Sequence, residues 1–150
     1  MAYAWDKSNR MLVKRTRKKY EYHRFASHMI ENELSALSDV VHGGGLAIVF
    51  PAWMKYVCRH DLQSFVRFAV RAWNVEERFH DPEATVREGI ARLEGFCRSI
   101  GLPTRFGEIG IAAKDFETIA VKYRRFHGDT VGNFARFDGK AVREIIEVVR

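Results

Sequence analysis

The sequence has little cysteine, little proline and no long apolar run. Its two cysteines, Cys58 and Cys97, lie far apart without a CxxC or other metal-binding spacing, which argues against a disulfide scaffold and a cysteine-held zinc site. The longest apolar run, residues 46–54, contains Pro51 and falls well short of the roughly 20 residues that span a bilayer. The first residues are polar and basic, so no secretory signal is indicated. These absences predict a cytoplasmic protein with two free thiols and no membrane segment.

Acidic residues are scarce at one end of the chain. Residues 1–24 hold eight Lys and Arg against two acidic side chains, whereas residues 25–150 hold 17 of each sign. The net charge of +6 therefore lies in the first segment, where the run Lys14–Lys19 repels itself and no apolar stripe is present. We predict a flexible basic arm over residues 1–24 and a neutral domain over residues 25–150. Because neither interleaved aromatics nor a recognition helix accompanies the run, a solvated tail is favoured over a nucleic-acid contact.

Alternation with period two is absent, whereas apolar residues recur at helical spacing throughout the neutral domain. With 150 residues and 47% hydrophobic composition, the chain is long enough for one packed domain. We therefore predict an all-α fold, a helical bundle of about six helices without internal repeats. The expected helices are residues 25–37, 46–58, 62–73, 82–100, a segment around 116–123 that ends near Gly128, and a last helix that Asp138 can cap.

Local signals set several of these boundaries. Asp61 is placed to cap the third helix, and Asp81 with Pro82 begins the fourth, which Gly101 ends. The expected buried stripes are Ile30, Leu34 and Leu37 in the first helix, Val86, Ile90, Leu93, Cys97 and Ile100 in the fourth, and Val142, Ile145, Ile146 and Val149 in the last.

The second helix is apolar on most faces, so we expect it to lie in the centre of the domain, bent at Pro51. The glycines at 43–45 favour tight packing and capping over phosphate binding, because they follow a helix rather than a strand. Trp53, Met54 and Tyr56 are predicted core residues rather than a substrate pocket.

The six histidines include one pair that suggests chemistry. His28 and His42 are fourteen residues apart, so one helix can carry the first and the start of the next helix the second, with both rings facing one cleft. Imidazoles from adjacent helices commonly hold a divalent metal. A chain with six histidines often contains such a pair by chance, so ordinary hydrogen-bonded histidines remain the alternative. The three histidines that follow His42 are expected to be solvated at helix ends or turns; they are His60, His80 and His127.

The residues around this pair carry a resemblance to a known family. The pattern HMIExELSALxDVxHGxGLAIVFPAWMKYV begins at His28, and the later motifs LPTR (102–105), EIGI (108–111) and VGNF (131–134) follow in order. Together they resemble the all-helical C-terminal half of iron-containing (type III) alcohol dehydrogenases of the dehydroquinate synthase-like fold, in the butanol dehydrogenase-like branch. The likeness covers roughly residues 25–150 and leaves out residues 1–24.

The resemblance implies a site for Fe²⁺ or Zn²⁺, which that family holds with one aspartate and three histidines. His28 and His42 match the last two histidines, and the metal acts on the alcohol oxygen as a Lewis acid. Asn32 stands at a site-lining position where the family usually has another histidine, and asparagine cannot relay a proton near neutral pH. Glu31 and Asp39 are candidate substitute oxygen ligands, although solvated or capping roles are favoured for both.

The other two ligands have no counterpart in residues 1–24, where His23 lacks an accompanying Asp-x-x-x-His motif. The family's nucleotide-binding half is also without counterpart, so we expect an N-terminally truncated chain that uses NAD or NADP only if that half is supplied. A separate polypeptide or a homo-oligomer is the expected partner, with a small alcohol or aldehyde as substrate. The competing hypothesis is a non-catalytic helical interaction module or remnant whose basic arm contacts anionic partners.

Overall fold

The computed structural model describes residues 26–127 and 139–149. Within these ranges the chain forms six α-helices, two 3-10 helices and no strand, which confirms the all-α prediction. The predictions for the basic arm, the 131–134 motif and the Asp138 cap lie outside the described residues. The helices cover residues 26–38, His42–Val57 (α2), Leu62–Trp73 (α3), Pro82–Ser99 (α4), Ala113–His127 (α5) and Gly139–Glu147 (α6), with 3-10 turns at Cys58–His60 and Phe106–Ile109.

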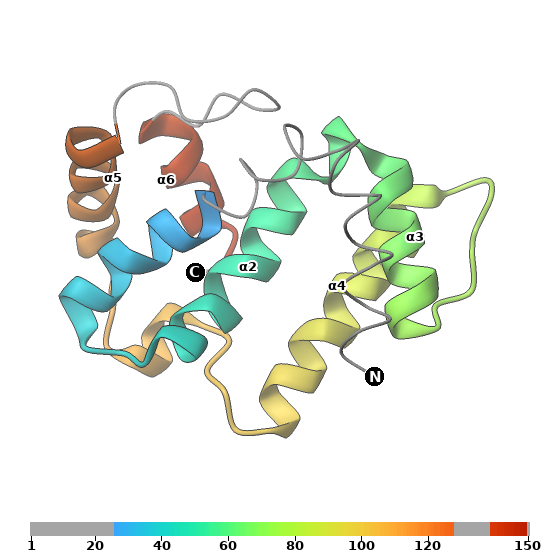
Figure 1. The fold of residues 1–150 in the computed structure, drawn as a ribbon, viewed down its shortest axis with the longest axis horizontal. Coiled ribbons are helices and arrows are strands. Elements are labelled where there is room, and N and C mark those ends of the chain that lie inside the picture. The colour runs from blue at the N-terminus through green and yellow to red at the C-terminus, as the bar shows by residue number, and fades with distance from the viewer. Residues whose placement is uncertain (1–25, 128–138, 150) are drawn as a thin grey trace, which may run out of the picture.

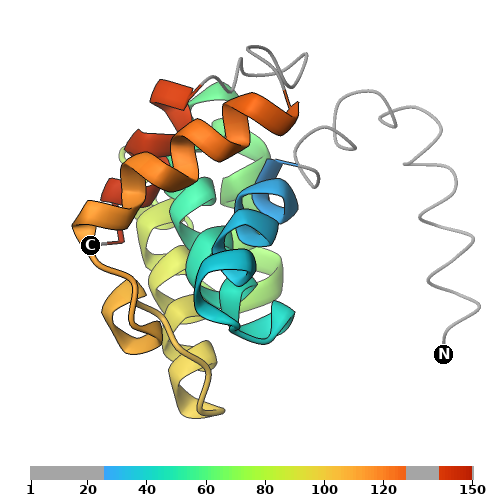
Figure 2. The same cartoon turned by 90° about the vertical axis from the view of Figure 1, so that its left-hand side faces the viewer.

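Helix α2 passes through the middle of the molecule, with α3 and α4 on one side and α5 and α6 on the other (Figures 1 and 2). Ten of its 16 residues are buried, and it contacts both α4 and α6. This position follows from an apolar sequence on most of its faces. Trp53 and Met54 are buried in the core and Tyr56 packs against it, as predicted. No helix in the described part of the chain is long and apolar enough to cross a membrane.

Helices α3 and α4 pack closely and run in the same direction, because Ala69 lies beside Gly89 and Trp73 beside Arg92, while the connecting loop returns along them to the start of α4 (Figure 1). The two backbones come close at Gly89, where a Cβ atom would lie 2.4 Å from the Cβ of Ala69 and 2.8 Å from its Cα. Only glycine allows the two backbones to come this near.

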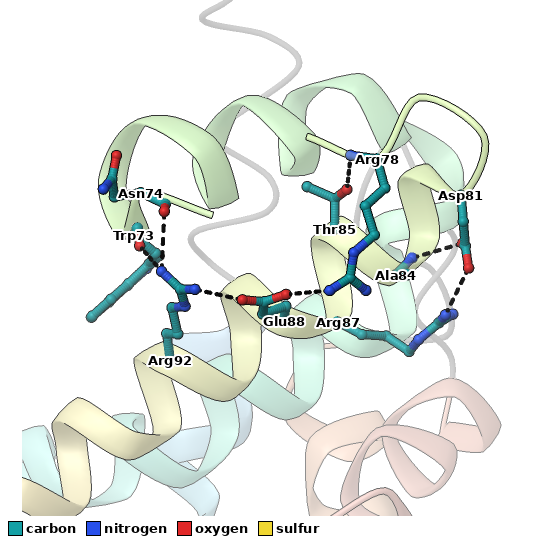
Figure 3. Close-up of polar contacts among 9 residues, drawn as sticks. All are labelled: Trp73, Asn74, Arg78, Asp81, Ala84, Thr85, Arg87, Glu88 and Arg92. Carbon is teal, nitrogen blue, oxygen red and sulfur yellow. Dashed lines mark hydrogen bonds and ion pairs between the residues drawn. The ribbon is translucent and has the colours of Figure 1, made fainter. Parts of the chain in front are cut away.

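The loop between α3 and α4 is held by a chain of charged groups (Figure 3). Glu88 accepts from Arg78 at 2.8 Å and from Arg92 at 2.5 Å, while Arg92 donates to the carbonyls of Trp73 and Asn74 at 2.8 and 3.1 Å. Asn74 ends α3 in the left-handed region with φ of 52°. These exposed contacts add little stability individually, but together they hold the loop after α3 against Glu88 and Arg92 of α4.

Several predicted helix ends are confirmed and others are wrong. The Asp81 carboxylate accepts from the Ala84 N–H at 2.9 Å at the start of α4, and Gly101, with φ of 79°, follows its end. Asp61 stands at the N-cap of α3, but its carboxylate accepts from the Ser64 hydroxyl rather than from the backbone. Asp39 ends the 26–38 helix with φ of 51° and does not cap α2, whose N-cap is Val41.

Two predicted stripe positions are wrong. Leu37 is 40% exposed and Ile100 is 55% exposed, because each lies at the end of its helix, where the chain turns away from the core. The last helix buries Val142, Ile145 and Ile146 as predicted, and Val149, in the turn just after the helix, is also buried, all four at 6% exposure or less. In the 26–38 helix the buried stripe instead includes Ser27, Ile30, Glu31 and Leu34, each 0% exposed.

Candidate metal site

The two histidines singled out by their spacing lie together at the junction of two helices. His28 is in the first turn of the 26–38 helix, and His42 is the first residue of α2. The chain reverses between them through Asp39, whose N–H bonds to the Ser35 carbonyl at 3.0 Å. As a result the two ring centroids are 5.4 Å apart with an angle of 52° between the planes. Both side chains are exposed, so the pair faces outward from the core.

The early start of α2 creates this arrangement. The helix begins at His42, four residues before the predicted start at Leu46, and the three glycines form its first turn. Gly45 is required there, since a Cβ at this position would lie 2.6 Å from Oε1 and 2.8 Å from Cγ of Glu31. Gly43 has no such neighbour within 4 Å. The predicted tight packing of the glycines is thus confirmed at Gly45.

Glu31 is neither solvated nor a helix cap, which corrects the expectation from the sequence. Its side chain is 0% exposed, and it lies between three groups. The Ser35 hydroxyl donates to Oε1, the Nδ1 atom of His42 lies against Oε2, and Gly45 leaves room for the carboxyl group. No other hydrogen bond satisfies Oε2 within the described residues. Helical spacing contained the signal, because Glu31 falls on the buried stripe with residues 27, 30 and 34.

The spacing of the two imidazoles suits a shared metal ion. Two rings that bind one tetrahedral ion at about 2.1 Å from each nitrogen have centroids roughly 5 Å apart, close to the observed 5.4 Å. Across residues 26–127 and 139–149, no group of three or more His, Cys, Asp or Glu side chains is placed to hold a metal. The pair therefore fits two coordination positions of an ion, and the others need water or groups from elsewhere.

The remaining predicted residues lie around or away from this pair. Asn32 is exposed one turn after His28 on the same helix, and Asp39 is exposed in the turn that precedes His42. His60 is exposed in the 3-10 helix and His80 is exposed in a turn, while His127 is the last residue of α5. These three histidines occupy the helix ends and turns expected from the sequence.

An apolar pocket of about 370 Å³ opens beside His28. Its walls come from the 26–38 helix, α2, α4 and the turn after α4, and include Leu46, Phe50, Cys97 and Leu102. Burial raises the pKa of the Cys97 thiol, and the neighbouring Glu94 carboxylate raises that pKa further. A thiol with a raised pKa is mostly protonated near neutral pH, and the protonated form is a weak nucleophile. Both cysteines are free, as predicted.

Comparison with known proteins agrees with this architecture. A family model for the C-terminal part of the Fe-containing alcohol dehydrogenase family matches residues 21–149. The NADH-dependent butanol dehydrogenase A of Clostridium acetobutylicum is 33% identical over 125 residues, which are 83% of this chain and 32% of that protein.

Two solved structures extend the comparison to the fold. The NADH-dependent butanol dehydrogenase A of Thermotoga maritima superposes with a TM-score of 0.77 at 33% identity, over 83% of this chain and 32% of that one. The aldehyde reductase YqhD of Escherichia coli gives a TM-score of 0.76 at 27% identity, over 84% of this chain and 33% of that one. The chain spans about a third of the length of these relatives. It belongs to the Fe-containing alcohol dehydrogenase family, and it matches that family's helical C-terminal domain.

Proposed function

We propose that this chain is the metal-binding helical domain of an iron-dependent alcohol dehydrogenase of the butanol dehydrogenase kind. The reaction would be the NAD- or NADP-linked interconversion of a small alcohol and its aldehyde. The observation that carries the proposal is the pairing of His28 with His42 across two successive helices, at a spacing that suits one ion. The activities for which the relatives are named, butanol dehydrogenase and aldehyde reductase, support the substrate class.

His28 and His42 would hold Fe²⁺ or Zn²⁺ through neutral imidazole nitrogens. The ion would supply Lewis acidity toward a hydroxyl or carbonyl oxygen, and neutral ligands leave its positive charge undiminished. Asn32, one turn after His28, is placed to donate and accept hydrogen bonds beside the pair, but an amide does not exchange protons near neutral pH as an imidazole does.

The pocket beside His28 supports a small aliphatic substrate. Its volume of about 370 Å³ and its lining by Leu46, Phe50 and Leu102 suit a short alkyl chain, which gains free energy by leaving water. Because the pocket adjoins His28, an alkyl chain seated in it would have its oxygen end near the imidazole pair.

The described residues do not fit a dinucleotide. They contain no strand and therefore no strand, glycine-rich turn and helix unit, and the glycines at 43–45 are used in packing against Glu31 and in the first turn of α2. These residues therefore have no proposed role in binding the nicotinamide. The proposal assigns that binding to an α/β half supplied by a further segment or a separate polypeptide, consistent with relatives about three times as long.

The proposal is tested by titrating the 150-residue chain with Zn²⁺ and, anaerobically, with Fe²⁺ in a calorimeter. We expect weak binding of one ion, because the pair supplies only two protein ligands. His28→Ala and His42→Ala should each weaken it by roughly tenfold or more, about 1.4 kcal/mol. His80→Ala removes an exposed imidazole from the turn before α4 and should leave binding unchanged. Unaltered stoichiometric binding in either of the first two variants would contradict the assignment of that residue.

A further inference from the structure

Glu31 is an ionisable side chain in a place that normally excludes such groups. Its side chain is 0% exposed, and its neighbours on the same buried stripe include Ile30 and Leu34, which belong to the apolar core. Moving a carboxylate out of water is costly unless the group is paired and hydrogen-bonded. A residue of this kind on the core side of a helix therefore calls for a compensating contact.

Three separate features of the chain accommodate this one carboxyl group. The Ser35 hydroxyl, one turn further along the helix, donates to Oε1. Gly45, in the first turn of α2, has no side chain at the point where a Cβ would meet Oε1 and Cγ. The Nδ1 atom of His42 lies against Oε2, which no other hydrogen bond satisfies among the described residues. The arrangement directs the second oxygen of Glu31 at one nitrogen of one imidazole.

This contact decides which nitrogen of His42 carries the proton. A neutral imidazole has one N–H donor and one acceptor nitrogen, and a carboxylate accepts but does not donate. With Oε2 against Nδ1, the proton of neutral His42 belongs on Nδ1, which leaves the Nε2 lone pair unprotonated. A carboxylate on the far nitrogen of a metal-binding histidine is a recurring way to set its orientation and to raise its basicity.

We propose that Glu31 is a positioning residue for His42, which it holds in the Nδ1–H tautomer so that Nε2 serves as the metal-binding nitrogen. The inference deepens the proposed function and rests on it for the metal. Ser35 and Gly45 hold Glu31 in turn, so residues of both helices contribute to the orientation of one ligand. Asp39, which is exposed in the turn before His42, has no part in this arrangement.

The first measurement is the tautomer of His42 in the metal-free chain, read from ¹⁵N chemical shifts and long-range ¹H–¹⁵N correlations of the imidazole. The resonances are assigned by their loss in His42→Ala. We expect neutral His42 to carry its proton on Nδ1 in the native chain and to lose this preference in Glu31→Gln. A native chain with the proton on Nε2 would overturn the inference whatever the metal data show, and this reading needs no variant of Glu31 to fold.

The second measurement is the dissociation constant for Zn²⁺. Glu31→Gln keeps the size of the side chain but removes the charge, and should raise the dissociation constant by roughly 10- to 100-fold. Glu77→Gln removes an equal charge from an exposed position in the loop before α4 and should change the dissociation constant by less than about twofold, since screened exposed charges interact weakly.

The outcomes separate the two proposals. If His42→Ala abolishes Zn²⁺ binding but Glu31→Gln does not weaken it, the metal site stands and the role of Glu31 is wrong. If Glu77→Gln weakens binding as much as Glu31→Gln, the effect comes from general charge rather than from positioning, and the inference is again wrong. If His42→Ala leaves binding intact, the proposed metal site itself fails.

Discussion

At the scale of single residues, the candidate site depends on a buried acid and a glycine that makes room for it. Gly45→Ala would place a Cβ atom 2.6 Å from Oε1 and 2.8 Å from Cγ of Glu31. Ordinarily alanine is preferred to glycine inside a helix by about 1 kcal/mol, but here the carboxyl group must move away from its contacts. We expect a net loss of about 1–3 kcal/mol in the free energy of unfolding, measured by urea denaturation, together with weaker Zn²⁺ binding.

The matched control lies in the same helical turn. Gly43→Ala adds the same methyl group where no atom lies within 4 Å, so it should stabilise the chain by a few tenths of a kcal/mol to about 1 kcal/mol. If both variants are equally stable, the buried position of Glu31 beneath Gly45 is wrong.

At the scale of helices, α3 and α4 pack closely where Gly89 faces Ala69. Gly89→Ala would bring a Cβ atom to 2.4 Å from the Cβ and 2.8 Å from the Cα of Ala69. Because a backbone atom cannot be displaced as a side-chain tip can, the two helices must separate. We expect the free energy of unfolding, followed by circular dichroism in urea, to fall by about 1–3 kcal/mol.

Two further variants distinguish packing from helix propensity. Gly95→Ala lies in the same helix with no atom within 4 Å of the added Cβ and should gain about 0.5–1 kcal/mol. Ala69→Gly introduced into Gly89→Ala removes the opposing methyl group and should recover part of the loss. No recovery in the double variant would contradict the close approach of these two helices.

The sequence predicts helices where local signals agree with the tertiary structure. Asp81 with Pro82 and Gly101 bound α4 as expected, because capping and turn chemistry are local. The start of α2 was missed because three successive glycines disfavour a helix by intrinsic propensity. Contact between Gly45 and Glu31 overrides that preference, and such contact is not visible in a window of sequence.

One part of the candidate site is predictable from the sequence and another part is not. The approach of His28 and His42 was predictable from their spacing across two helices, and the structure brings their rings together. The sequence does not predict the contact between Glu31 and His42, because acidic side chains are mostly exposed to solvent. Its position on the stripe with Ile30 and Leu34 was the available signal.

At the scale of the whole molecule, one apolar core joins the described helices. It includes Ile30 from the 26–38 helix, Trp53 from α2, Ile90 from α4, Tyr123 from α5 and Ile145 from α6. Elements that share a core of this kind are expected to unfold together. A titratable group buried in α5 should therefore influence unfolding that is detected in α2.

Tyr123 provides that group. Its side chain is 0% exposed, and burial raises its pKa to about 12 from the ordinary value of 10. The folded chain therefore keeps the phenol proton at pH values where the unfolded chain has lost it. The stabilisation is complete below about pH 10 and is lost as pH rises toward 12, with a slope of about 1.4 kcal/mol per pH unit. Other titrating groups contribute to the same pH range, so the effect must be isolated by comparison.

Tyr123→Phe removes the phenol and leaves the ring, so the difference between the two chains isolates this one titration. Unfolding in urea is followed by tryptophan fluorescence, to which the buried Trp53 of α2 contributes. Between pH 9 and pH 11, the native chain should lose about 1 kcal/mol more stability than Tyr123→Phe. Because the probe and the titrating group lie in different helices, this result requires α5 and α2 to unfold as one unit. Parallel pH profiles for the two chains would mean that α5 separates from the core before Trp53 is exposed, or that the phenol titrates as it does in water.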